Sequence, residues 1–378
     1  MIGYFAVRLE RVFGMDLPET PVDTTSAAKR AWEPMDKAGW TWSHLLCADP
    51  LIIHAMPSTG FPLGSASVIG PLVRDRKAYF LVTPAQTIEP PGAAQTLIDI
   101  ARTYLRDHPR HQLIYLGNTE RERQLMAEAN FEAVTLNQNC LLDDTLFHPI
   151  RGVEPIYDAV YNARLSPEKR HELAVEIERV AFIYFYNSFE HTVPQFHAEH
   201  SRLQAMMPRA RFINELTPEG CRWLPPNCIN EVLAKSRVGL CLSPVEGAMR
   251  VAIEYLFAGL SIVSTPSLGG RDHYFDDDYC IIAEPDPRSI REAANALAKR
   301  AVPREIVRAK TLARVEADRT RYIALVQELV VREGGAEQFA DRFWALIRAR
   351  DILAWRAMND FSSTVTAALK TSAPGQIK

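Results

Sequence analysis

Short apolar runs alternate with amphipathic stretches from residue 51 onward. The apolar runs are rich in β-branched and aromatic residues and are bounded by proline and glycine, which is typical of strands, whereas the amphipathic stretches repeat with a helical period. In the first half of the chain these patterns predict strands over 51–56, 65–73, 78–84, 111–118 and 133–138, and helices over 92–108 and 119–130. Residues 1–48 carry signals too weak to assign an element.

The alternation starts again after a connector near residue 150, where charged and proline-bearing sequence has neither a helical nor a strand period. Strands are predicted over 157–163, 181–187, 238–243, 261–266 and 280–285, and helices over 167–180, 227–236, 246–259 and 286–300. Helical patterns then dominate residues 303–367. Because strands separated by helices favour parallel sheets with right-handed crossovers, we expect an α/β protein with two doubly wound, Rossmann-like domains.

The length of 378 residues also favours two domains, since single cores stop growing near 250–300 residues. We expect an N-terminal domain over 1–150, a second domain over 151–332, and C-terminal helices over 333–378 that dock on the domains through their aromatic residues. Ligands of such sheets bind outside the carboxyl ends of the strands, so we expect a site in a cleft between the two domains.

Composition narrows the choice of partners. The formal net charge of -3 gives no general attraction to nucleic acid or to an anionic membrane, so any anion site must be local. The six cysteines are scattered without paired ligand spacing, which favours reduced thiols in the cytoplasm. Charges at Arg8, Glu10 and Arg11 interrupt the apolar core that a signal peptide needs, and no run reaches transmembrane length, so only peripheral membrane contact is compatible with the sequence.

The segment 242–270 carries the most chemical information. A strand leads into a loop with Glu246 and then into an apolar helix with Glu254 two turns along. Amides near Gly247 and Ala248, at the start of that helix, would offer donors to a phosphate, and the carboxylates can accept sugar or ribose hydroxyls. The alternative is that Glu254 only pairs with Arg250 at i−4 while Glu246 acts as a charge at the helix start; from this segment alone the two interpretations are equally supported.

This segment resembles the donor-binding motif of glycosyltransferase family four. That motif has two glutamates in the positions of Glu246 and Glu254, followed by a strand matched by 259–263 and a Gly-Gly loop matched by Gly269 and Gly270. The resemblance implies that Glu246 faces the transferred sugar and that Glu254 holds the ribose, with the residues between them, Gly247, Ala248, Met249 and Arg250, also at the donor.

A second match lies upstream, where Arg164 and Lys169 stand in the family's Arg-x-x-Pro-Glu-Lys pattern. The resemblance implies that both cations bind the donor diphosphate, since fixed cations stabilise the charge that develops on a leaving diphosphate without a metal. By itself this stretch, with Arg164, Lys169 and Arg170, is better interpreted as a solvated helix start. A third, weaker match at 137–149 resembles the loop that ends the family's first domain.

The resemblance covers roughly residues 140–300 and implies a GT-B fold, with two Rossmann-like domains facing across a cleft. It further implies a retaining glycosyltransferase that moves a hexose-type sugar from a UDP- or GDP-linked donor, without a metal or other cofactor, to an acceptor that the sequence does not identify. Two departures stand out: Met249 replaces a glycine found in many members, and residues 1–30 lack the family's glycine-rich loop.

Other candidate residues have weaker support. His54, at the end of a predicted strand, matches a histidine that some relatives place near the donor sugar, although a structural histidine is the favoured interpretation. His191, His197 and His200 have no nearby cysteine or tight pair that would support a zinc site, so we expect a solvated face. The charged stretch 271–278 would suit a cation, but acidic loops of this kind are usually solvated.

Two alternative functions stay open at this point. A sugar-nucleotide epimerase or hydrolase on the same fold would need carboxylates or histidines from the N-terminal domain at the anomeric carbon. A non-catalytic nucleotide-sugar-binding protein would explain the methionine at position 249 and the divergent N-terminal domain.

Overall fold

A computed structural model of the chain describes residues 40–56, 63–187, 191–336, 338–348 and 356–371. The chain forms two compact units. The first contains residues 1–142 and 318–378, and the second contains residues 143–317. The division between the units after Leu142 lies a few residues before the boundary expected at 150, and the C-terminal residues from 318 onward belong to the first unit.

The first unit is built on a six-stranded sheet with the order β14-β1-β2-β3-β4-β5. Its strands are β1 (Trp40–Ala48), β2 (Leu51–Met56), β3 (Ala78–Val82), β4 (His111–Gly117), β5 (Glu132–Thr135) and β14 (Arg356–Ala357). Strands β2 to β5 are parallel and follow one another in chain order, while β1 pairs antiparallel with β2 and β14. Strand β1 lies in the stretch whose sequence signals assign no element.

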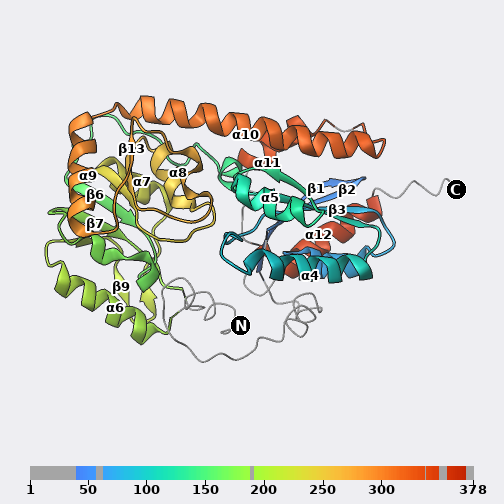
Figure 1. Ribbon diagram of the computed structural model, residues 1–378, viewed down its shortest axis with the longest axis horizontal. Coiled ribbons are helices and arrows are strands. Elements are labelled where there is room, and N and C mark those ends of the chain that lie inside the picture. The colour runs from blue at the N-terminus through green and yellow to red at the C-terminus, as the bar shows by residue number, and fades with distance from the viewer. Residues whose placement is uncertain (1–39, 57–62, 188–190, 337, 349–355, 372–378) are drawn as a thin grey trace. The chain divides into compact units, whose positions relative to one another are not determined.

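Helices cover both faces of this sheet (Figure 1). One face packs against α3 (Ala66–Leu72), α4 (Ala93–Asp107), α5 (Glu120–Glu128) and α12 (Met358–Thr371), which share one apolar core with the strands. The C-terminal half of α10 (Arg304–Arg332) and α11 (Phe339–Arg348) lie on the other face. A doubly wound sheet usually covers its second face with crossover helices; here the C-terminal helices do so because the strand order does not reverse.

The second unit contains a parallel sheet whose strand order does reverse. Its strands are β6 (Tyr157–Asn162), β7 (Val180–Ile183), β8 (Arg211–Phe212), β11 (Ser236–Cys241), β12 (Ser261–Ser264) and β13 (Cys280–Ile282), in the order β13-β12-β11-β6-β7-β8. The chain therefore starts in the middle of the sheet at β6, builds outward to β8, and returns to β11 on the other side of β6. This is the strand order of dinucleotide-binding folds.

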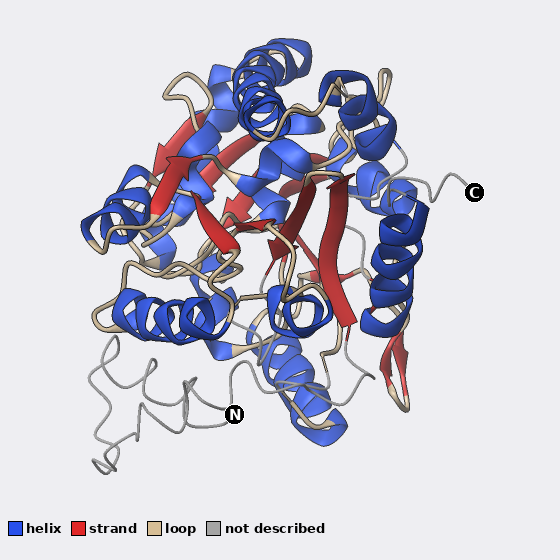
Figure 2. Ribbon diagram, turned by 90° about the vertical axis from the view of Figure 1, so that its right-hand side faces the viewer, coloured by secondary structure: helices blue, strands red, loops and turns tan. Residues whose placement is uncertain are grey.

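The remaining elements of the second unit pack around this sheet. Figure 2 draws all described helices of the chain in blue and all described strands in red. The helices are α6 (Val193–Met206), α7 (Pro226–Ala234), α8 (Arg250–Phe257), α9 (Pro287–Arg300) and the first half of α10, and a small hairpin pairs β9 (Leu216–Thr217) with β10 (Gly220–Cys221). Apolar residues of β6, β7 and β11 form a core with α6 and α9. The predicted alternation of strands and helices is thus confirmed for most of the chain.

Three local predictions were wrong. Residues 65–73 form helix α3 instead of a strand, because in so short an apolar stretch the period cannot separate a strand from a buried helix. Residues 167–180 form two short 3-10 turns, Pro167–Lys169 and His171–Ala174, because Arg170 between them has φ +50° and cannot continue a right-handed helix. The helix expected from 246 begins only at Arg250.

Two chain-wide features complete the fold. All six cysteines carry free thiols. None of the described helices is both long and apolar enough to cross a membrane.

Candidate functional site

The predicted donor residues follow two adjacent strands of the second unit. Arg164 and Lys169 follow β6, and Glu246 follows β11, which pairs in parallel with β6. The strand order reverses between these two strands. Ligands of such open sheets bind outside the carboxyl ends of the strands, at this switch point.

An ion pair joins the two predicted motifs at this point. Lys169 Nζ donates a hydrogen bond to Glu246 Oε1, although 77 positions separate the two residues in sequence. The Lys169 side chain is 10% exposed and the Glu246 side chain 14%, so little water screens the pair. The Tyr161 hydroxyl donates to the Lys169 carbonyl at 2.7 Å and holds the turn that carries the lysine. The structure thus brings together two residues that the sequence could only associate by motif.

The environment keeps Glu246 ionised. Burial alone would raise the pKa of its carboxyl group, but the charge and hydrogen bond of Lys169, together with the positive charge of Arg271, lower that pKa below its ordinary value. A carboxylate that is ionised and already paired can accept hydrogen bonds from the hydroxyl groups of a neutral ligand. It also neutralises the charge of Lys169.

Arg164 lies at the start of the same loop. Its guanidinium is 3.9 Å from the Glu168 carboxylate, and the Arg164 side chain is 22% exposed. The Ser166 hydroxyl donates to the same carboxylate at 2.5 Å. Arg164 and Lys169 are therefore carried by one short loop after β6.

Glu254 forms the ion pair that the alternative interpretation expected. Arg250 Nε donates to Glu254 Oε1 at 2.9 Å, within the first turns of α8. The two partners differ in exposure, at 53% for the arginine side chain and 11% for the glutamate. Burial raises the pKa of Glu254 and outweighs the opposing effect of Arg250. The pair occupies one oxygen of the Glu254 carboxylate.

The loop between Glu246 and α8 has an unusual backbone. Ala248 is fully buried, and Met249 has φ +44° and ψ +86°, in the left-handed region that favours glycine. The Met249 side chain packs against the apolar core of the unit, which offsets part of the strain. The position at which many members of the resembling family have a glycine thus requires a left-handed backbone, and in this chain a methionine adopts it.

The Gly-Gly loop also lies beside Glu246. The Glu246 amide donates to the Leu268 carbonyl at 3.0 Å, and the Leu268 amide donates to the Pro244 carbonyl at 3.0 Å. Gly269 follows directly with φ +97°, a value that side chains rarely adopt. The two parts of the predicted motif are therefore joined by backbone hydrogen bonds.

Two arginines that the sequence did not identify as site residues close the carboxyl ends of β11 and β12. Arg170 Nε donates to the Leu242 carbonyl at 2.7 Å, and Arg170 Nη2 donates to the same carbonyl and to the Thr265 hydroxyl, the latter at 2.8 Å. Only its position next to Lys169 could have suggested a role for Arg170.

Arg271, the second of these arginines, is fully buried. Its guanidinium donates to the Ser243 carbonyl at 2.7 Å and to the Thr265 carbonyl, and its Nε donates to Asp272 at 2.7 Å. The charged stretch 271–278 was expected to be solvated, but its first residue, Arg271, is a buried cation. The acidic residues further along, Asp276 and Asp278, pair with Lys310.

His54 has a structural environment in the first unit. It is completely buried, with Nδ1 2.9 Å from the Tyr322 hydroxyl and Nε2 3.2 Å from the Thr83 hydroxyl. Both ring nitrogens are occupied, so the imidazole has no atom left for a donor sugar. The geometry supports the structural interpretation and not a catalytic one.

The three histidines near α6 do not form a common face. His200 is buried against the Phe212 ring, with ring centres 4.5 Å apart, so it is not on a solvated surface as expected. His197 Nε2 lies 3.3 Å from the Gly220 carbonyl. Within the described part of the chain, no group of three His, Cys, Asp or Glu residues could hold a metal ion.

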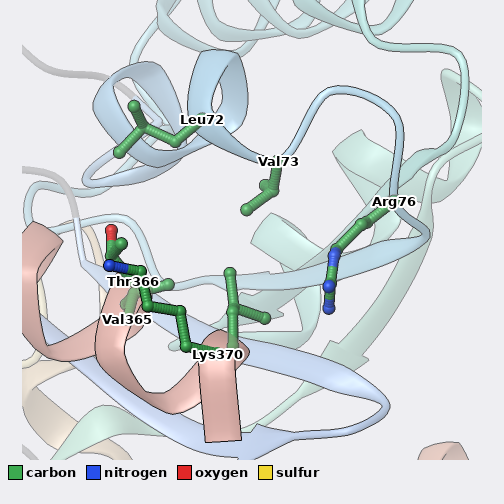
Figure 3. Close-up of a pocket in the computed structure, with 7 residues that line it drawn as sticks. Leu72, Val73, Arg76, Val365, Thr366 and Lys370 are labelled. Atoms are coloured by element: carbon green, nitrogen blue, oxygen red, sulfur yellow. The ribbon is translucent and has the colours of Figure 1, made fainter. Parts of the chain in front are cut away.

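A groove in the first unit has no link to these residues. It has a volume of about 330 Å³ and lies between the end of α3 and α12 (Figure 3). Its lining consists of Leu72, Val73, Arg76, Val365, Thr366, Leu369 and Lys370. None of these is a predicted donor residue.

Comparisons with known proteins support the fold. No protein-family model matches the sequence, and no curated protein matches it either. Among solved structures, sucrose-phosphate synthase from Thermosynechococcus elongatus is similar over 72% of this chain and 75% of that one, with a TM-score of 0.53 and 16% identity. An α,α-trehalose-phosphate synthase (UDP-forming) from Burkholderia vietnamiensis is similar over 75% of this chain and 73% of that one, with 10% identity and a lower TM-score of 0.49. The chain has the GT-B fold of glycosyltransferases.

The first prediction concerns acid stability. Burial lowers the pKa of His54 to about 4 from 6.5, so the unfolded chain takes up this proton at higher pH than the folded protein does. The His54 contribution to the free energy of unfolding should therefore fall by about 1.4 kcal/mol per pH unit as pH decreases from 6.5 to 4. Replacing the imidazole by His54→Leu costs hydrogen bonds at pH 7, but the gap to wild type should narrow as the pH falls. Thermal unfolding of both proteins at pH 7, 6, 5 and 4.5 measures this gap, and a constant gap would show that His54 does not resist protonation.

The second prediction concerns the ion pair. Glu246→Gln leaves a poorly solvated ammonium without its carboxylate, so it should lower the free energy of unfolding by about 3 kcal/mol. Adding Lys169→Met should recover much of that loss, because no charge is then left unpaired. Urea unfolding of the two single variants and the double variant gives their coupling.

The exposed Arg179–Asp158 pair of the same unit, at 2.5 Å, is the matched control. Its coupling should not exceed about 1 kcal/mol, because water screens it. Strictly additive losses at Lys169 and Glu246 would mean that their contact contributes nothing.

Proposed function

We propose that this chain is a retaining glycosyltransferase that resembles family four and transfers a hexose-type sugar from a nucleotide-diphosphate donor. The observation that carries the proposal is the Lys169–Glu246 pair at the switch point of the second sheet. The motif resemblance associates these two residues from the sequence alone, and in the folded chain they form an ion pair. The ion pair supports the proposal that both residues belong to one site.

In the proposed site, Lys169 and Arg164 bind the donor diphosphate. Negative charge grows on the leaving diphosphate as the glycosidic bond breaks, and fixed cations in a site with little water lower the barrier most effectively. Because Lys169 pairs with Glu246, donor binding must redirect its ammonium group toward the phosphates. This assignment needs no metal.

Glu246 and Glu254 are proposed to bind the sugar and ribose hydroxyls, respectively. As Lys169 turns to the diphosphate, the Glu246 carboxylate becomes free to accept hydrogen bonds from the sugar. The second carboxylate keeps Arg250 as its partner on the exposed side of α8. Loop residues 247–249 separate the two carboxylates along the chain, and the left-handed Met249 limits how that loop can move.

The free thiols agree with a reducing compartment such as the cytoplasm. An epimerase or hydrolase would need a first-unit histidine or carboxylate at the anomeric carbon, and His54 cannot serve because both its ring nitrogens are bonded.

The third prediction tests the function directly. UDP- and GDP-linked sugars are first ranked by how far each raises the melting temperature. Transfer is then measured as release of nucleoside diphosphate in the presence of a panel of sugar, lipid and small-molecule acceptors. Lys169→Met should lower kcat by about 10² to 10³, the usual effect of removing one charge-stabilising group.

Lys310→Met is the control, because Lys310 also pairs with a carboxylate in the second unit but lies at the exposed surface. It should keep wild-type turnover. Unchanged turnover in Lys169→Met would refute the site. Release of free sugar without any acceptor dependence would favour a hydrolase instead.

A further inference from the structure

Arg170 connects the two chain segments that carry the ion pair. Its backbone directly follows Lys169, and its guanidinium reaches across to Leu242, four residues before Glu246. The Thr265 hydroxyl accepts from the guanidinium and donates to the same Leu242 carbonyl at 3.0 Å. One side chain therefore ties the loop after β6 to the ends of β11 and β12.

The backbone of Arg170 is strained, which indicates that the side chain is needed. Its φ and ψ are +50° and +46°, in the left-handed region that a glycine would occupy at no steric cost. Strained residues cluster at functional sites, where the surrounding structure holds them in place. A second strained residue, Met249, lies three positions after Glu246, so both partners of the ion pair are close to left-handed backbone.

Arg170 differs from Arg271 in how its charge is balanced. Arg271 is fully buried and has Asp272 as a carboxylate partner, as expected of a structural arginine. The guanidinium of Arg170 is bonded to a carbonyl and a hydroxyl, and no described carboxylate forms an ion pair with it. A cation whose hydrogen-bond acceptors are neutral is not neutralised by them. The positive charge of Arg170 therefore also acts on the adjacent Lys169 and on the switch point of the sheet.

We propose that Arg170 is the positioning residue of the donor site: its guanidinium fixes the spacing between Lys169 and Glu246 by clamping the Leu242 carbonyl and the Thr265 hydroxyl. The role at a donor site rests on the proposed function; the control of spacing does not. The planar fork of arginine suits this task because it can donate in two directions from one rigid group. A lysine would keep the charge but not both directions.

The binding test uses UDP and GDP as probes, by isothermal titration calorimetry at constant salt. Arg170→Met keeps most of the side-chain length and removes charge and donors, and it should weaken binding of the better nucleotide roughly tenfold, within the range of coupled neighbours. Arg170→Lys should not restore the affinity. Full rescue by lysine would overturn the proposal, because it would show that charge alone matters.

Backbone strain is controlled separately. Arg170→Gly relieves the left-handed conformation and should still lose affinity, since the clamp is gone. Ala301→Gly is the matched control, because Ala301 has nearly the same backbone, with φ +47° and ψ +43°, at the end of α9. The Ala301 variant should bind nucleotide like wild type. Wild-type affinity in Arg170→Gly would overturn the proposal.

A second measurement stands independently of any nucleotide. The coupling between Lys169 and Glu246 is obtained from urea unfolding of the Lys169→Met and Glu246→Gln variants, once in the wild-type background and once with Arg170→Met. If Arg170 sets their spacing, the coupling should fall to roughly half or less when Arg170 is replaced. An unchanged coupling would overturn the inference. Failure of the wild-type protein to bind either nucleotide would instead count against the proposed function, so the two failures are distinguishable.

Discussion

The second unit depends on the carbonyl groups at the carboxyl ends of two adjacent parallel strands, β11 and β12. Carbonyls that follow these strands lie beyond the sheet, and buried carbonyls without hydrogen bonds are costly. Arg170 and Arg271 satisfy these groups from the loops on either side. The same side chains hold the loops at a fixed distance, so the structural solution for the strand ends also positions Lys169 and Glu246.

A buried ion pair at this place is better explained by chemistry than by stability. Removing two charges from water costs several kcal/mol per ion, and well-packed apolar residues would often be as stable. The pair between Lys169 and Glu246 therefore adds a free-energy cost of desolvation to a sheet that already has a large apolar core. Its presence at the switch point, with strained backbone beside both partners, fits a site in which a ligand exchanges with one member of the pair.

The first unit shows how a similar sheet can be completed differently. Its parallel strands follow chain order, so crossover helices cover only one face and the C-terminal helices must cover the other. His54 and Tyr322, 268 positions apart, form part of that second contact. The histidine that resembled a ligand-binding residue thus holds the C-terminal helix on the sheet, which explains its complete burial.

The sequence by itself determined the alternation of strands and helices and the α/β fold class, because these follow from local periodicity. Its short motifs supplied the hypothesis for the donor residues. It could not determine the boundaries of short apolar elements such as α3, since strand and helix periods are indistinguishable over so few residues. It left the role of Glu254 open, because an i, i+4 pair has the same sequence whether or not the carboxylate also binds a ligand. Only the tertiary structure decided that Lys169 meets Glu246, that Arg170 clamps the strand ends, and that His54 is fully bonded. These contacts join positions far apart in the chain, and their geometry depends on strand order and on backbone torsions that no local pattern encodes.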